Sequence, residues 1–282
     1  MRLGRIPYIN CFPVYGAVDR GIVPIDAELV DGVPTALNRM MADGALDVSV
    51  VSAVEYARDS ARYLLLPDLA ISCDGPVRSV MLFSHLPAEQ LGEKRVLVSR
   101  SSMTSVHLLE LLFEHVWHAQ PEFVPGDAEA DSIGKDDPSE VAARLVIGDA
   151  ALMLQSAEHP LAQAHGGFYQ HVYDLGAEWK AWTGLPFVFA VWAAREEIVT
   201  AELVVPFTES FETGLAELDQ IIAETAEESG LPAAILRDYF TRNLRYRMGP
   251  AEQAGLAEFL RRAESHGLTT APATLRFAHA AI

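Results

Sequence analysis

The fold is decided by the stretch Leu69-Ala70-Ile71-Ser72-Cys73-Asp74-Gly75-Pro76-Val77-Arg78-Ser79-Val80-Met81-Leu82-Phe83, in which two apolar runs flank a polar turn. Adjacent Asp, Gly and Pro are typical of a turn, and Leu69–Ser72 and Val80–Phe83 have the composition of buried strands. Two interpretations of Arg78 and Ser79 stay open: turn residues with Arg78 at the surface, or members of a binding site. We expect the chain to cross near Ser79–Ser84 into a second lobe.

Short apolar runs alternate with amphipathic segments on both sides of this stretch, which predicts an open α/β sheet with crossover helices. One helix is expected from Pro34 to Gly44, because Pro favours a first helical position and Leu37, Met40 and Met41 share one face. The other predicted strands are Leu3–Ile6, Ala27–Val30, Val48–Val51, Leu64–Leu66, Arg95–Ser99, Leu145–Ile147 and Val188–Ala193. The other predicted helices are Pro13–Arg20, Ser101–Trp117, Ala150–Ala157, Ala201–Ser229, Pro232–Phe240 and Pro250–His266, and the Gly- and Asp-rich segment 126–137 is predicted to be a loop.

The length of 282 residues favours two lobes, because single hydrophobic cores stop growing near roughly 250–300 residues. We expect the chain to return near Phe189–Arg195 and to complete the first lobe with its C-terminal helices. The predicted lobes are residues 1–84 plus 194–282, and residues 85–193. Ligands of open α/β sheets bind beyond the carboxyl ends of the strands, which here predicts a site in the cleft between the lobes.

The charge of the chain limits its partners. The formal net charge is −18 and the sequence pI is about 4.8. Nucleic acid and anionic lipid both require neutralising Lys and Arg, so we expect neither a nucleic-acid partner nor a membrane partner. The same field repels a small anion at long range, so an anion site must be built locally from helix N-termini and hydroxyl groups.

The expected compartment is the cytoplasm. Two cysteines, Cys11 and Cys73, are more simply interpreted as reduced thiols than as a structural disulfide. Residues 1–10 enter a predicted strand without the apolar run of a secretory signal, and no stretch approaches the roughly 20 apolar residues of a membrane helix.

The usual catalytic signatures are missing from the sequence: there is no GxGxxG, Walker loop, HExxH, CxxC pair or GxSxG. His107, His115 and His118 fall near one face of a predicted helix, which is the best metal-like pattern. Nothing in the sequence supplies further convergent ligands, so a partly solvated helix face is favoured and we expect no metal.

Small polar residues lie at the ends of the predicted strands, namely Asn10, Ser52, Ser79, Ser101–Ser105 and Gly148-Asp149. Ser101–Ser105 contains more hydroxyl groups than one N-cap requires, which favours an anion site at this helix start over capping alone. Asn10 and Asp149 keep simpler interpretations, as a turn residue and an N-cap. The residue types alone lead to a two-lobed protein that binds a small anion.

Longer motifs at these positions resemble a known family. They are Arg5-Ile6-Pro7-Tyr8-Ile9-Asn10 with Pro13, Leu37–Met41, Gly44 with Asp47–Ser49, Ser52 with Glu55–Ala57, Ile71–Val80, Thr104-Ser105, Ile147–Leu152 and Trp179–Ala190. Over about residues 2–193, and more weakly beyond, the chain resembles the chorismate dehydratases of the futalosine route to menaquinone. This resemblance implies a periplasmic-binding-protein type II-like fold with an interlobe cleft, no cofactor, and dehydration of chorismate to 3-[(1-carboxyvinyl)oxy]benzoate.

The resemblance also implies roles for individual residues. Asn10 and Ser79 are expected to contact the reacting face of the substrate as catalytic residues, and the helix start at Ser102, Thr104 and Ser105 is expected to hold a carboxylate. The other expected substrate contacts are Tyr8, Ser52, Arg78, Gly148 and Asp149. Ser and Asn are poor bases at neutral pH, so no protein base is evident and the proton acceptor stays open; one hypothesis is that the substrate's own side-chain carboxylate removes the proton from ring carbon C3.

Two other functions remain open from the sequence. A 1,4-dihydroxy-6-naphthoate synthase of the same pathway shares the lobed fold, but the stretches 75–80 and 183–190 resemble the dehydratase more. A non-catalytic small-anion binding protein would need an export signal, an anchor or a DNA-binding element, none of which the sequence shows convincingly. We expect a monomer or a homodimer whose lobes close over the ligand.

Overall fold

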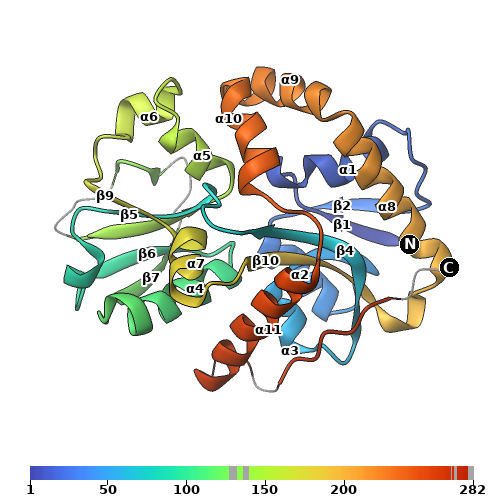
Figure 1. Ribbon diagram of the computed structural model, residues 1–282, viewed down its shortest axis with the longest axis horizontal. Helices are drawn as coiled ribbons and strands as arrows, with labels where there is room; N and C mark the ends of the chain where they lie inside the picture. The colour runs from blue at the N-terminus through green and yellow to red at the C-terminus, as the bar shows by residue number, and fades with distance from the viewer. Residues whose placement is uncertain (127–131, 136–139, 268, 270–271, 279–282) are drawn as a thin grey trace.

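The computed structural model describes residues 1–126, 132–135, 140–267, 269 and 272–278. Within these residues the chain forms two five-stranded sheets that lie side by side, each with its own helices (Figure 1). The predicted α/β class with two lobes is therefore confirmed. None of the helices in the described part of the chain combines the length and the apolar character that a membrane crossing requires.

The first sheet has the strand order β2-β1-β3-β10-β4. β1 pairs in parallel with β2 and β3, whereas β10 runs antiparallel between β3 and β4. β3 is buried along its whole length, as its unbroken apolar run predicts for a strand covered on both faces. The strands are β1 (Arg2–Arg5), β2 (Glu28–Asp31), β3 (Val48–Ser52), β4 (Tyr63–Cys73) and β10 (Phe187–Arg195).

The second sheet has the strand order β7-β6-β8-β5-β9. β6 pairs in parallel with β7 and β8, and β5 runs antiparallel to β8 and β9. The antiparallel strand that follows a crossing between the lobes is therefore β5 in the second sheet and β10 in the first. The strands are β5 (Val80–Ser84), β6 (Arg95–Ser99), β7 (Glu122–Gly126), β8 (Ala143–Ile147) and β9 (His171–Asp174).

The crossings flank the cleft between the sheets. β4 runs toward the second lobe, and β10 lies antiparallel beside it and runs back into the first lobe (Figure 1). β5 belongs to the second sheet and β10 to the first. The lobe limits at residues 84/85 and 193/194 stay a prediction, and the strand pairing favours crossings slightly earlier, at 74–79 and 184–186.

The helices lie at the strand connections and at the C-terminal end of the described chain. The C-terminal helices α8, α9 and α10 lie with the first sheet, and α11 runs between the two lobes (Figure 1). The helices are α1 (Phe12–Asp19), α2 (Pro34–Ala42), α3 (Ala53–Arg58), α4 (Thr104–Leu112), α5 (Asp149–Gln155), α6 (Pro160–His165), α7 (Leu175–Thr183), α8 (Ala201–Ala216), α9 (Leu218–Ser229), α10 (Ala233–Asp238) and α11 (Pro250–Ser265). Short turns are η1 (Ile9–Cys11), η2 (Ala88–Gln90) and η5 (Glu196–Ile198), and single π-turns η3 (Phe113–Trp117) and η6 (Tyr239–Asn243) extend α4 and α10.

Several predicted elements have different limits in the structure. The two strands predicted at 64–66 and 69–72 form one strand, β4. Between them Asp68 adopts a positive φ of 56°, and the pairing with β10 continues with a shift in register. The helix predicted over 201–229 is two helices that meet at Glu217, and the one predicted from Ser101 begins at Thr104. Strands β7 and β9 and helices α3, α6 and α7 were not predicted, and most of the loop predicted over 126–137 lies outside the described residues.

The core of the first lobe carries a buried polar contact beside its aromatic packing. The indole Nε1 of Trp192 donates to the hydroxyl of Tyr15 at 2.8 Å, and that hydroxyl donates to the carbonyl of Gly4 at 3.2 Å. Both aromatic side chains are fully buried, so these bonds satisfy groups that burial would otherwise leave unpaired. Cys11 and Cys73 are separate buried thiols, as predicted.

Candidate active site

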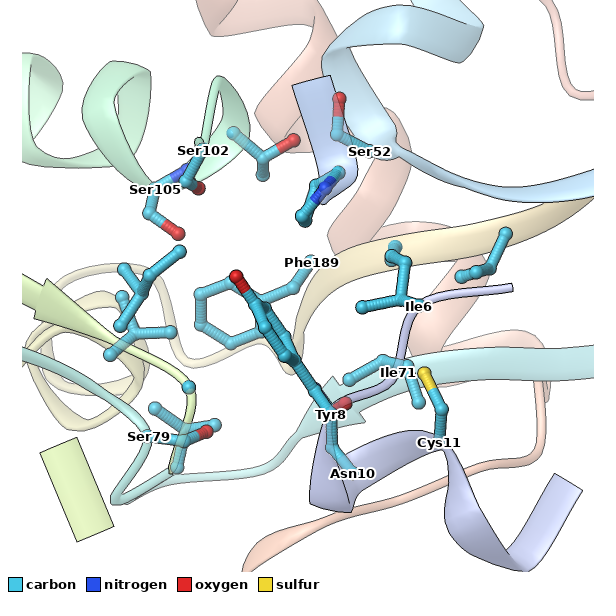
Figure 2. A pocket seen from close by; sticks show the side chains of 18 residues that line it. Ile6, Tyr8, Asn10, Cys11, Ser52, Ile71, Ser79, Ser102, Ser105 and Phe189 are labelled. Carbon is cyan, nitrogen blue, oxygen red and sulfur yellow. The ribbon is translucent and has the colours of Figure 1, made fainter. Parts of the chain in front are cut away.

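A cavity lies between the two lobes and encloses about 640 Å³, a volume that includes the open solvent at its mouth (Figure 2). The predicted site residues that line it are Tyr8, Asn10, Ser52, Ser79, Ser102, Thr104, Ser105 and Gly148. The remaining wall is almost entirely apolar and consists of Ile6, Cys11, Pro34, Val50, Ile71, Val77, Val80, Ile147, Phe189 and Ala190. The structure thus brings most of the predicted residues together in a cavity whose wall is largely apolar.

The polar side chains reach the cavity because of where the strands end. Tyr8 and Asn10 follow β1, Ser52 ends β3, residues 102–105 follow β6, and Gly148 follows β8. These strands are parallel within their own sheets, so their carboxyl ends face the cleft together. This is the position at which open α/β sheets bind ligands.

Asn10 presents an unused hydrogen-bond acceptor. It lies in the short turn η1, and its Oδ1 atom is buried without a hydrogen-bond partner among the described residues. A buried amide oxygen without a partner is destabilising by roughly 1–3 kcal/mol, so such atoms are rare in the absence of a function. The Asn10 amide is therefore the clearest indication that the cavity accommodates a polar ligand.

Ser52 is oriented by two donors. Its Oγ accepts from the side-chain Nδ2 of Asn38 at 3.0 Å and from the backbone N–H of Glu55 at 3.2 Å. The second bond caps helix α3, a role that the sequence analysis did not assign to this residue. Because both acceptor positions of the hydroxyl are occupied, its own hydrogen is left to donate, and Ser52 lines the cavity.

The start of α4 contributes further donors. Ser102 Oγ accepts from the backbone N–H of Ser105 at 3.3 Å, and Thr104 Oγ1 accepts from the backbone N–H of Val54, on the first lobe, at 3.1 Å. Each hydroxyl keeps a hydrogen to donate, and the positive end of the helix dipole faces the same cavity. Ser102 and Ser105 lie at this helix start on the side of the cavity opposite Asn10 (Figure 2). The arrangement suits a carboxylate.

Ser79 is positioned by a carboxylate that sequence analysis did not identify. Asp174 ends β9, caps α7, and accepts from the backbone N–H groups of Val77 at 3.0 Å and Arg78 at 2.7 Å. It also accepts from Gly176 at 3.0 Å and Ala177 at 3.1 Å, and burial raises its pKa although these four donors oppose the shift. One side chain thus holds the crossing segment that carries Ser79.

Tyr239 contacts Ser79 from behind. Its fully buried hydroxyl is a hydrogen-bond partner of the Ser79 side chain, and burial raises the pKa of the phenol far above its usual range. Tyr239 lies in η6, a π-turn, and such irregular turns often occur at functional sites. The phenol therefore stays protonated at neutral pH and can hold the orientation of the serine hydroxyl.

The structure does not bring Arg78 to the cavity. Its φ is 67°, its backbone carbonyl accepts from Gln155 Nε2 at 2.6 Å, and its exposed side chain borders a different hollow on the second lobe. Of the two interpretations that the sequence left open, the turn residue at the surface describes Arg78, whereas Ser79 lines the cavity.

Asp149 lies behind the cavity wall. Its Oδ1 accepts from the backbone N–H of Ile9 at 3.1 Å, which joins the second lobe to the first, and burial raises its pKa to about 6 in spite of that bond. The preceding Gly148 has a φ of 64°, and a Cβ there would lie 3.4 Å from the ring of Tyr8. Asp149 thus fixes the turn that bears Tyr8 and is not one of the lining residues.

No charged side chain is among the residues that line the described cavity. The lining contains one thiol, that of Cys11, and burial raises the pKa of this thiol well above its usual range. Glu55 is buried beside the cavity wall but faces Arg58, whose Nη1 lies 3.9 Å from its Oε2. The lining therefore offers hydrogen-bond donors and an amide, and no ready general base at neutral pH.

Three functional residues were missed by sequence reasoning: Asn38, Asp174 and Tyr239. Asn38 lies within a predicted amphipathic helix, yet it is buried and its Oδ1 accepts from the backbone N–H of Ser52 at 3.2 Å. The signal that could have identified Asn38 was a polar residue among the apolar residues of that helix. Asp174 and Tyr239 act across more than 90 residues of sequence, so no local pattern could identify them.

The two sheets and the donor-lined cleft define the class: two-lobed α/β proteins that bind a small molecule between their lobes. Solved structures with this fold include a protein of Archaeoglobus fulgidus (TM-score 0.74, 22% identity, 95% of this chain and 97% of that one). The periplasmic aliphatic sulphonate binding protein SsuA of Escherichia coli also has it (TM-score 0.64, 13% identity, 96% and 89% covered). At these identities the likeness establishes the fold alone.

The sequence establishes the family. Residues 1–265 match the family described as menaquinone biosynthesis. A protein of Thermus thermophilus named chorismate dehydratase is 33% identical over 251 residues, which cover 86% of this chain and 88% of that protein. A chorismate dehydratase of Campylobacter jejuni is 27% identical over 194 residues, covering 67% and 66%. The chain belongs to the menaquinone biosynthesis family, and the resemblance found in its motifs is confirmed.

Proposed function

We propose that the protein is a chorismate dehydratase, a hydro-lyase of the futalosine-dependent route to menaquinone. The observation that carries this proposal is a cleft lined by hydroxyl donors and one unpartnered amide oxygen, with no charged side chain in its described lining. The activity named for the Thermus thermophilus and Campylobacter jejuni relatives supports it. A biosynthetic role of this kind is compatible with the cytoplasm, which we propose as its compartment.

The reaction explains why so plain a site suffices. Chorismate carries a hydrogen and an enolpyruvyl ether on ring carbon C3 and a hydroxyl on C4. The C3–H bond breaks and its electron pair enters the ring, while the C4–O bond breaks with its own pair. The proton and the leaving hydroxide form water, and the remaining six-membered ring is aromatic. The overall driving force is therefore large, and the protein has only to orient the substrate and to stabilise developing charge.

The helix start at Ser102–Ser105 would hold a carboxylate of the substrate. When the C3 proton leaves, its electrons can delocalise through the diene toward the ring carboxylate, where negative charge grows. Hydroxyl hydrogens and the N-terminal dipole of α4 would stabilise that charge as an oxyanion hole does, and the apolar wall would strengthen the effect.

Asn10 and Ser79 would contact the reacting carbons from the other side of the cavity (Figure 2). The Asn10 Oδ1 acceptor suits the C4 hydroxyl, whose hydrogen needs a partner once water is excluded. The Ser79 hydroxyl, oriented by Tyr239, suits either the leaving oxygen or the enolpyruvyl group. Both would act by hydrogen bonding, because neither side chain is basic at neutral pH.

The proton acceptor would be the enolpyruvyl carboxylate of chorismate itself. The carboxyl groups of Asp149 and Glu55 both face protein partners outside the cavity lining. A substrate carboxylate held beside C3 reacts intramolecularly and would pass the proton to the leaving hydroxide. No other base is then required.

The test is to incubate the purified protein with chorismate and to follow the products by chromatography and mass spectrometry. We expect loss of one water to give the enolpyruvyl benzoate, with no added metal or cofactor. A folded protein that binds chorismate and leaves it intact would contradict the proposal. Conversion of the cyclic futalosine derivative instead would assign the naphthoate synthase activity.

A further inference from the structure

Two histidines from different lobes meet outside the cleft. His115 lies in η3, which extends α4 of the second lobe, and His266 ends α11, which follows the strands of the first lobe. Their Nε2 atoms are 2.9 Å apart and the two rings are nearly perpendicular, at 84°. The carboxylate of Glu114 adds an oxygen 3.3 Å from Nε2 of His266, and all three donor atoms lie within 4.8 Å of one another.

The hydrogen bonds of His266 fix which nitrogen is available. Its Nδ1 lies 2.8 Å from the backbone carbonyl of Arg262, which can only accept, so Nδ1 carries the hydrogen. In the neutral ring the lone pair is then on Nε2, directed at His115 and Glu114. A histidine that donates Nδ1–H to a backbone carbonyl is the usual outer contact of a metal-binding imidazole.

The ring of His115 is held by packing. It stacks on Trp182 of α7 with a centroid distance of 5.2 Å and an angle of 26°. The guanidinium carbon of Arg262 lies 4.0 Å from the ring centroid of Trp182, and its Nε donates to Oε1 of Glu258 at 2.7 Å. Both neighbours stabilise the positive charge of Arg262.

We propose that Glu114, His115 and His266 form a site for a divalent transition metal of the kind that prefers imidazole, and that the metal joins the two lobes. Two imidazole nitrogens bound to zinc at about 2.0–2.1 Å in tetrahedral geometry lie about 3.3 Å apart, so a shift of a few tenths of an ångström suffices. The two nitrogens and one carboxylate oxygen leave a fourth position for water. Mg²⁺ prefers an all-oxygen shell and is not expected to bind here.

A metal at this place would act on the cleft. His266 belongs to the chain that completes the first lobe, and Glu114 and His115 belong to the second, so the ion would hold the two lobes in the arrangement that the structure shows. Exchange of ligand through the cleft would slow as a result. This consequence for turnover rests on the proposed function, whereas metal binding does not.

The test is a calorimetric titration of metal-free protein with Zn²⁺ and, separately, with Mg²⁺. We expect one Zn²⁺ per chain, a melting temperature that rises with zinc concentration, and no comparable effect of Mg²⁺. His115→Ala and His266→Ala abolish both zinc effects. The matched control is His107→Ala on the same helix, where His107 pairs with Glu110 at 2.8 Å, and it retains both effects.

Glu114→Gln keeps the proposal testable if the histidine variants fold poorly, because the side chain of Glu114 is 58% exposed. We expect it to weaken zinc binding at least about 10-fold with an unchanged metal-free melting temperature. Zinc binding that is equal in wild type, His266→Ala and Glu114→Gln overturns the site, as does a response to Mg²⁺ equal to that for Zn²⁺. A chain that binds zinc at this site and leaves chorismate intact would refute the proposed function alone.

Discussion

Replacing Asp149 with asparagine separates a structural role of this carboxyl group from a catalytic one. The folded chain raises the pKa of Asp149 from its ordinary 3.8 to about 6, because burial outweighs the hydrogen bond from Ile9. The carboxyl group is still mostly ionised at neutral pH, so the folded protein bears the cost of burying that charge, which the unfolded chain does not. Asparagine has nearly the same shape, keeps an oxygen that can accept from the Ile9 N–H, and carries no charge.

The size and sign of the effect follow from linkage. A carboxyl group whose pKa is raised on folding adds no penalty below pH 3.8, and the penalty grows as the pH rises through 6. About two pKa units correspond to about 3 kcal/mol, an upper value because Asp149 keeps some contact with solvent. We expect Asp149→Asn to raise the free energy of unfolding by up to about 3 kcal/mol at pH 7.5, falling to about 1 kcal/mol near pH 4.5.

Urea unfolding of both proteins across this pH range measures the difference. Asp26→Asn, at an exposed position, is the matched control and should change the unfolding free energy by less than about 0.5 kcal/mol. We also expect the variant to convert chorismate within about 10-fold of the wild-type rate, since the proposed base is the substrate. A destabilised Asp149→Asn would refute the electrostatic reasoning, and a loss of activity of about 1,000-fold or more would make Asp149 the base.

Three further variants test the supports of the site. Asp174→Ala should lower the free energy of unfolding by about 1–3 kcal/mol in urea titrations, because backbone N–H groups of the crossing segment lose their acceptor. Asp174→Asn keeps an acceptor oxygen and should lower the free energy of unfolding by less, so equal losses in the two variants would contradict this role. Gly148→Ala should be destabilising by about 1–3 kcal/mol in thermal unfolding, owing to its positive φ and the nearby Tyr8 ring, and an unchanged melting temperature would count against it. Tyr239→Phe should lower kcat/KM about 10-fold with the fold intact, and a wild-type kcat/KM would show that Ser79 needs no such partner.

The strands and most of the cleft could be predicted because their signals are local. Unbroken apolar runs identify buried strands such as β3, and the small polar residues that follow them must lie at the carboxyl edge of a sheet. Ser52 was found in this way, whereas Ser79, which directly precedes β5, was identified from the turn and the family resemblance of the stretch 71–80. Arg78 could not be placed, since a positive φ at one residue turns its side chain away from the cavity that its neighbour lines.

What the sequence could not show depends on contacts between distant segments. Asp174 reaches the crossing across 97 residues of sequence, and the partner of His115 lies 151 residues away. The sequence analysis expected no metal because it found no further ligand for the histidines of one helix. The structure supplies that ligand from α11, which no pattern within the helix could indicate.

The central claim is that a cleft without a protein base converts chorismate by hydrogen bonding alone. The most direct measurement is the rate of enolpyruvyl benzoate formation from chorismate by the wild type, Asn10→Ala and Ser79→Ala, with Ser229→Ala on α9 as a control outside the cavity lining. The account predicts turnover by the wild type and the control, and rates lower by about 100- to 1,000-fold in the two cleft variants. Undiminished turnover in Asn10→Ala and Ser79→Ala, or unchanged chorismate with the folded wild type, would contradict it.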